Sequence, residues 1–116
     1  MMDIESLREY CLAKQGAVEA LPFGDETLVF KVFDKIFLLT SLSGSGSFNV
    51  KCDPEKAISL REEHAEVEPG YHMNKKHWNT VSLSGKLTVH QLTEMIDHSY
   101  DLIVQSLPKS KQQRLS

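Results

Sequence analysis

The chain has 116 residues, which is the length of a single domain with one hydrophobic core. Its hydrophobic fraction of 41% and charged fraction of 25% are those of an ordinary globular protein, and no apolar run approaches the roughly 20 residues that a transmembrane helix needs. The net charge of −3 disfavours a dedicated nucleic-acid-binding domain, because such domains are usually basic.

The first residues, Met-Met-Asp-Ile-Glu, have neither the apolar run of a signal peptide nor the basic composition of a transit peptide. We therefore expect a cytoplasmic protein that is not attached to a membrane. The two cysteines, Cys11 and Cys52, fall in different predicted elements. In the cytoplasm they are expected to be reduced thiols, with Cys11 on the buried face of a helix.

Charge is unevenly distributed along the chain. Residues 1–68 contain 13 acidic and 7 basic residues, whereas residues 69–93 contain three lysines and no acidic residue. Residues 94–116 contain three residues of each sign. The segment 69–93 is therefore the only long acid-free stretch, and it is the first place to look for contacts with an anionic partner.

The first half of the chain predicts a helix followed by a hairpin. Apolar residues recur at helical spacing over 3–14, with Asp3 at the N-cap, and residues 17–25 read as a connector. Two apolar segments, 27–33 and 36–42, then alternate as strands. Between them, Asp34-Lys35 stands where a two-residue hairpin turn belongs.

The next elements are a flexible hairpin loop, a strand and a helix. Residues 43–47, Ser-Gly-Ser-Gly-Ser, form the loop, and residues 48–52 form a third strand. Asp53 followed by Pro54 predicts the start of a second helix, which reaches His64.

The last part of the chain predicts a strand and a long helix. Residues 78–83 alternate, which places Trp78 and Asn79 on opposite faces of a strand. A capping box formed by Thr88 and Gln91 starts a helix of nearly 20 residues with one apolar face. The domain is expected to cover 1–108, and residues 109–116 to form a frayed polar tail.

Together these elements indicate the α+β class. Hairpin-length connections make the first strands antiparallel, and clustered strands flanked by helices are typical of α+β domains. We expect a single antiparallel twisted sheet of about four to five strands. The N-terminal helix and the long C-terminal helix should pack mainly on one face, leaving the other face at least partly open.

Four blocks of the sequence resemble a known family. They are Pro-Phe-Gly-Asp-Glu-Thr-Leu-Val-Phe-Lys-Val at 22–32, Lys-Ile-Phe at 35–37, Cys-Asp-Pro-Glu at 52–55 and Tyr-His-Met-Asn-Lys-Lys-His-Trp-Asn-Thr-Val at 71–81. These blocks are similar to the MmcQ/YjbR family of small bacterial proteins, and the resemblance covers nearly the whole chain. It implies an α+β fold related to frataxin-like and secretion-chaperone-like architectures. It also implies DNA binding, which is commonly attributed to the family on the basis of a proposed double-wing arrangement.

The acid-free stretch supplies candidate contacts to nucleic acid. Lysines can bind phosphates, aromatic rings can stack on bases, and asparagines can hydrogen-bond to base edges. Weak binding through the segment 71–86 is our first functional hypothesis. The structural alternative is that the tryptophan anchors a strand in the core and the paired lysines form a solvated turn. The predicted nucleic-acid-binding residues are Tyr71, Asn74, Lys75, Lys76, Trp78, Asn79 and Lys86.

The histidines of this stretch do not predict a metal site or a catalytic site. The spacing of His72 and His77 does not match a zinc pattern, and the two lysines between them would repel a cation. No nucleophile or carboxylate stands at a spacing that suggests acid–base catalysis. We therefore expect no metal, no cofactor and no enzymatic activity. The polar residues on one side of the last helix are interpreted as a solvated face: Asp97, His98 and Asp101.

A second hypothesis is a protein-interaction or chaperone-like module that uses the open face of the sheet. Phe33, Phe37 and Phe48 are candidates for an apolar patch on that face, which would bind a protein partner or form a homodimer. An enzyme is the third choice, and the sequence names no reaction for it.

Overall fold

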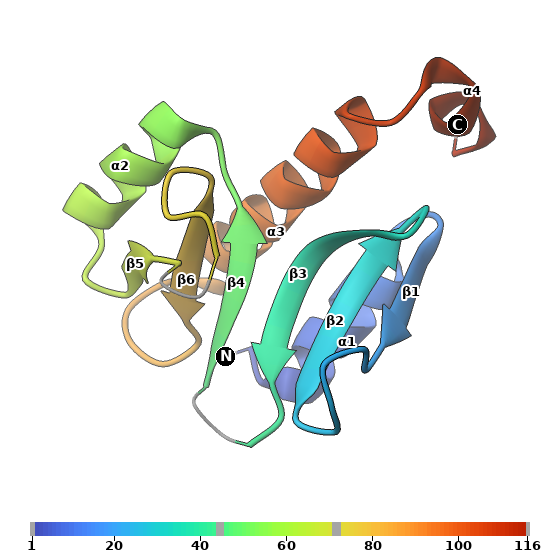
Figure 1. The fold of residues 1–116 in the computed structure, drawn as a ribbon. Helices are drawn as coiled ribbons and strands as arrows, with labels where there is room; N and C mark the ends of the chain where they lie inside the picture. The colour runs from blue at the N-terminus through green and yellow to red at the C-terminus, as the bar shows by residue number, and fades with distance from the viewer. Residues whose placement is uncertain (1, 44–45, 71–72, 116) are drawn as a thin grey trace.

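The computed structural model describes residues 2–43, 46–70 and 73–115, which form a six-stranded antiparallel sheet and four helices (Figure 1). The strand order is β1-β2-β3-β4-β6-β5. None of the helices within these ranges is long and apolar enough to cross a bilayer. In chain order the elements are α1 (Ile4–Leu12), β1 (Ala17–Ala20), β2 (Thr27–Val32), β3 (Lys35–Ser41), β4 (Ser47–Lys51), α2 (Pro54–Glu63), β5 (Val67–Pro69), β6 (Trp78–Ser82), α3 (Val89–Gln105) and α4 (Lys109–Arg114).

The predicted α+β class and the single antiparallel sheet are confirmed, and the sheet has more strands than expected. The two additional strands, β1 and β5, form its edges. β1 has the sequence Ala-Val-Glu-Ala, and β5 contains Pro69, so neither carries a strong strand pattern. An edge strand needs only one neighbour, and pairing with β2 or β6 supplies what the local sequence does not.

The helix starts follow the predicted caps. The Asp3 carboxylate accepts a hydrogen bond from the Ser6 N–H (2.8 Å), and the Asp53 carboxylate accepts one from the Lys56 N–H (3.2 Å). The capping box at the start of α3 is also present. The C-terminal residues differ from the expected frayed tail. Residues 109–114 form the short helix α4, and the following Leu115 packs against the core.

The predicted turn at Asp34-Lys35 is wrong by one residue. Val32 pairs with Lys35, so the two turn residues are Phe33 and Asp34, with φ angles of 48° and 65°. Positive φ at both positions is what a type I′ hairpin turn requires. The Phe33 ring packs partly against the core and lies 5.7 Å from the Lys111 ammonium, contacts that favour this register over the one read from the sequence.

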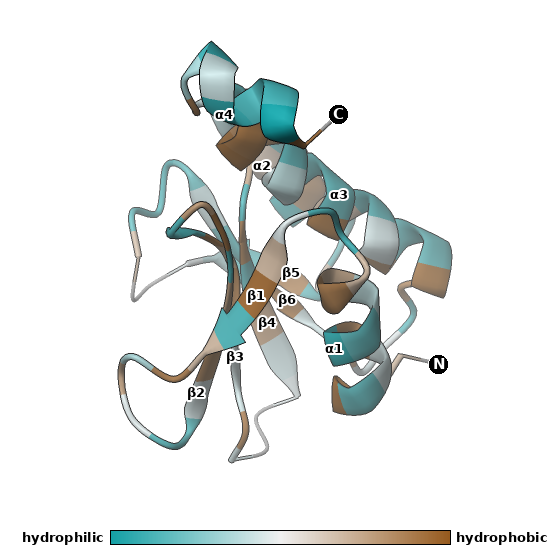
Figure 2. Cartoon of the chain, turned by 90° about the vertical axis from the view of Figure 1, so that its right-hand side faces the viewer, coloured by the Kyte–Doolittle hydropathy of each residue, from teal (hydrophilic) through white to brown (hydrophobic). Residues whose placement is uncertain are grey.

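The helices cover one face of the sheet. Figure 2 shows α1 and α3 on one side, while strands and connecting loops form the other side. The apolar side chains of the covered face, including Phe30, Leu38, Phe48 and Val81, form the core. We call the other side of the sheet the open face.

Two of the three phenylalanines expected on the open face are core residues, so that prediction is wrong. The register between β2 and β3 shifts at Phe30/Lys31, which leaves Phe37 as an extra residue and turns both Phe37 and Leu38 into the core. Phe48 is fully buried on the same covered face. The alternating pattern of the sequence does not reveal the bulge, so it misplaces Phe37.

Of the three polar side chains expected on a solvated face of α3, Asp101 is exposed, whereas Asp97 and His98 contact other elements. Asp97 accepts a hydrogen bond from the Tyr10 hydroxyl (2.6 Å) and pairs with Lys14, which ties α3 to α1. Burial and the neighbouring Asp97 raise the pKa of Tyr10 to about 12. His98 accepts a hydrogen bond from the Asp53 N–H at the start of α2 (3.1 Å).

A serine on α3 joins β3 to β4 where their backbone pairing stops. Leu38 and Val50 are the last register pair at that end. Beyond them, the buried Ser99 hydroxyl donates to the Phe37 carbonyl (2.5 Å) and accepts from the Lys51 N–H (2.9 Å). The hydroxyl therefore replaces a hydrogen bond between the two strands.

Replacing Ser99 with alanine should lower the free energy of unfolding by about 1–3 kcal/mol, because two backbone groups lose their partner. Urea denaturation followed by circular dichroism measures the change. Ser59→Ala, at an exposed position on α2, is the matched control and should change stability by less than about 0.5 kcal/mol. An equal effect of both substitutions would contradict the bridging role.

Candidate functional site

The paired lysines lie on a tight turn just before β6. Asn74 forms the turn: its side-chain oxygen accepts from the Lys76 N–H (3.0 Å), and its carbonyl accepts from the N–H groups of His77 and Trp78 (3.0 and 2.9 Å). Lys75 and Lys76 are exposed. Tyr71 and His72, which precede the turn, lie outside the described residues.

Arg61, in the last turn of α2, fixes this turn against the sheet. Its Nε donates to the Asn79 side-chain oxygen (2.7 Å), and its Nη2 donates to the carbonyls of Lys75 and Trp78, at 3.3 Å for the latter. One guanidinium thus contacts the turn and the first two residues of β6. The planar fork of donors in arginine is suited to such a contact, which a lysine cannot reproduce.

Trp78 lies on the open face beside a further lysine. In the register of β4 and β6, Trp78 is opposite Lys51, and directly opposed residues of an antiparallel pair point to the same face. Trp78 is half-buried. Lys51 and Trp78 thus share the open face, and the turn that carries Asn74, Lys75 and Lys76 directly precedes Trp78. We call these five residues the Trp78 surface.

Two of the predicted contact residues are not part of this surface. Asn79 is only 1% exposed and faces the helices, as the alternation of β6 requires. Lys86 follows the other end of β6, whose five residues span about 13 Å. Its N–H donates to the Glu66 carboxylate (2.6 Å), and this bond lowers the pKa of Glu66.

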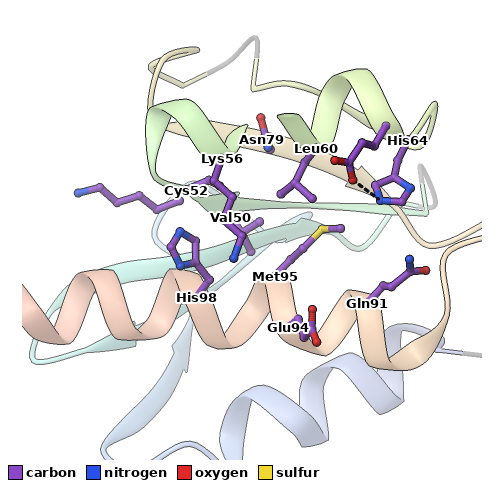
Figure 3. A pocket seen from close by; sticks show the side chains of 12 residues that line it. Val50, Cys52, Lys56, Leu60, His64, Asn79, Gln91, Glu94, Met95 and His98 are labelled. Carbon is purple, nitrogen blue, oxygen red and sulfur yellow. Dashed lines mark ion pairs between the residues drawn. The ribbon is translucent and has the colours of Figure 1, made fainter. Parts of the chain in front are cut away.

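A cavity of about 210 Å³ lies on the helix-covered face, between α2, α3 and the strands β4 and β6 (Figure 3). We call it the α2–α3 cavity. Val50, Leu60 and Met95 supply apolar walls. Figure 3 shows Lys56 and His98 toward one end, and His64 and Gln91 toward the other.

Burial affects two titratable groups that line the cavity. It lowers the pKa of His98, whose Nε2 accepts the Asp53 N–H and therefore leaves the ring proton on Nδ1. Burial also raises the pKa of Cys52, so this thiol stays protonated at neutral pH. A protonated thiol is a poor nucleophile. Across the described ranges, no group of three or more His, Cys, Asp or Glu side chains is placed to hold a metal ion.

Comparison with known proteins gives the family. A family model described as YjbR matches residues 12–102. The chain belongs to the YjbR family. Among its relatives, the uncharacterized protein YbdF of Escherichia coli O157:H7 is 40% identical, and the uncharacterized protein YjbR of Escherichia coli K12 is 36% identical. Both alignments cover 98% of this chain and 98% of the relative.

Solved structures of similar proteins have the same fold. The crystal structure of Deinococcus radiodurans protein DR2400 is 37% identical with a TM-score of 0.91, covering 99% of this chain and 88% of that one. A crystal structure of a protein from Pseudomonas syringae is 28% identical with a TM-score of 0.73, covering 87% of this chain and 98% of that one. The first of these similarities extends over nearly the whole chain.

Sequence reasoning missed two residues of the site. Nothing in the helix pattern singles out Arg61, and only its contacts with the distant turn reveal its role. Lys51 lies next to Trp78 because β4 pairs with β6, although the two residues are 27 positions apart in the chain. No local pattern marks either residue.

Replacing Arg61 with lysine should lower the free energy of unfolding by about 1–3 kcal/mol, because the buried Asn79 amide and two carbonyls lose their donors. Thermal or urea denaturation measures the loss. Arg8→Lys, in an exposed ion pair with Glu19, should change stability by at most about 1 kcal/mol. If the two variants were equally stable, the guanidinium would not have the role assigned to it.

Proposed function

We propose that this YjbR-family protein binds nucleic acid weakly through the Trp78 surface. The observation that supports this most directly is that two exposed lysines lie on a turn fixed by Arg61, next to a half-buried tryptophan. Lysines neutralise phosphates, and an exposed aromatic ring can stack on a base. The proposed location is the cytoplasm, where nucleic acid is present and two buried cysteines remain reduced.

The surface favours single strands over duplex. A tryptophan ring can stack only on a base that is not already stacked within a duplex. Three lysines, Lys51, Lys75 and Lys76, neutralise few phosphates, so the electrostatic contribution to affinity is small. Asn79 does not belong to the proposed surface, because it is buried on the other face of β6.

A labelled single-stranded oligonucleotide should bind at about 50 mM salt and lose about 20-fold in affinity at about 200 mM salt, because three neutralised phosphates give a slope of about −2.1. Fluorescence anisotropy measures the affinity. Binding should also quench the fluorescence of Trp78, the single tryptophan of the chain. The double variant Lys75→Glu, Lys76→Glu should bind at least about tenfold more weakly.

The matched control is Lys109→Glu with Lys111→Glu, which makes the same change of charge at two exposed positions on α4. This variant should keep most of the affinity. Equal losses in the two double variants would show non-specific attraction, and an absence of binding at the lower salt concentration would reject the proposal.

A second candidate function is self-association through apolar side chains at one end of the sheet. Phe23, Leu21 and Leu42 are 65%, 46% and 45% exposed. The Leu42 N–H donates to the Glu26 carbonyl (2.7 Å), which brings the end of β3 against the loop that carries the other two. Clustered exposed apolar side chains favour an interface, and a second copy of the chain is the simplest partner.

The mass measured by size-exclusion chromatography with light scattering should rise toward that of a dimer as protein concentration increases. Phe23→Ser should shift the equilibrium toward monomer, because it removes the most exposed of these side chains, whereas the double lysine variant should not. A monomer at every concentration tested would rule out this second function.

A further inference from the structure

Asn79 is a buried polar residue that is only partly satisfied. Its side-chain oxygen accepts the hydrogen bond from Arg61 Nε, but its Nδ2 has no hydrogen-bond partner within the described structure. Buried polar atoms in folded proteins are nearly always paired, so an unpaired amide donor requires an explanation.

Arg61 determines which way the Asn79 amide points. A guanidinium group can only donate hydrogen bonds, so the oxygen of the amide must face it and the nitrogen must face away. Asn79 lines the α2–α3 cavity. Figure 3 shows its nitrogen on the side of the cavity. A molecule bound there can therefore pair with this nitrogen only by presenting a hydrogen-bond acceptor.

The positive charge of Lys56 favours an anionic acceptor in this cavity. Lys56 lines the cavity and lies close enough to Cys52 and His98 for its charge to act on both side chains. A carboxylate would accept from Asn79 and lie near the Lys56 ammonium. Because charge-assisted hydrogen bonds are stronger than neutral ones, a carboxylate fits better than a neutral carbonyl.

The remaining walls limit the rest of the molecule. Val50, Leu60 and Met95 favour a short apolar body. Glu63 and Glu94 also line the cavity and would repel a second carboxylate. The volume of about 210 Å³ is below the range of about 300–1,000 Å³ that is usual for drug-sized ligands, so the molecule must be small.

We propose that the α2–α3 cavity binds a small organic monocarboxylate, whose carboxylate group accepts a hydrogen bond from Asn79 and faces Lys56. The apolar body of the molecule lies against Val50, Leu60 and Met95. This site is on the covered face of β6 and does not depend on the nucleic-acid proposal, which concerns the open face.

Benzoate is a suitable probe, and the uniformly ¹⁵N-labelled full chain is titrated with it while two-dimensional NMR spectra are recorded. The side-chain amide signals of Asn79 should shift, together with the backbone amide signals of Val50 and Met95. Benzamide, which keeps the shape without the charge, and terephthalate, which adds a second carboxylate, should bind at least about tenfold more weakly.

Asn79→Asp is the decisive variant. An aspartate keeps an acceptor for Arg61 and the shape of the side chain, but it removes the donor and adds a negative charge. Benzoate affinity, followed at Val50 and Met95, should fall at least about tenfold. Asn49→Asp is the matched control: it lies on the open face of β4, keeps an acceptor for the Thr80 hydroxyl, and should leave benzoate binding unchanged.

Lys56→Met tests the charge separately at an exposed position and does not depend on how Asn79→Asp folds. It should weaken benzoate binding several-fold, whereas Lys109→Met on α4 should not. Three results would overturn the proposal: no shift of the Asn79 amide signals, which would leave solvent as the partner of Nδ2; equal binding of benzamide and benzoate; or unchanged affinity in both cavity variants.

Discussion

Both candidate sites depend on the hydrogen bonds that the guanidinium group of Arg61 donates. It connects the end of α2 to the turn before β6 and to the first two residues of that strand. The contact is half-buried, where a hydrogen bond is stronger than in water and an unmade one costs more. It therefore fixes both the backbone that carries Lys75 and Lys76 and the orientation of the Asn79 amide.

Two adjacent residues of β6 divide the site between the faces of the sheet. Trp78 points to the open face and Asn79 to the helices, because side chains alternate along a strand. The stretch that is richest in polar and aromatic groups consequently serves two separate surfaces. Anionic partners are proposed for both, a phosphate backbone on one face and a carboxylate on the other.

The sequence allowed us to predict those features that depend on local chemistry. The caps at Asp3, Asp53 and Thr88, the α+β class and the two faces of β6 follow from short-range patterns and are confirmed. Features that arise from distant contacts were missed or misplaced. The bulge that buries Phe37, the edge strands β1 and β5, and the contacts of Arg61 all depend on neighbours that come together only in the folded chain. The α2–α3 cavity belongs to the same group, because four elements line it.

The two edge strands are short, which limits the addition of strands from another chain to the sheet. An unpaired strand edge can template the addition of another chain, and proteins avoid this with short edges, proline and charge. β5 has three residues, including Glu68 and Pro69, and β1 has four, including Glu19. Proline has no N–H to donate. The sheet of this protein should therefore resist fibril-like stacking even at high concentration, and any assembly should form through side chains on its faces and loops.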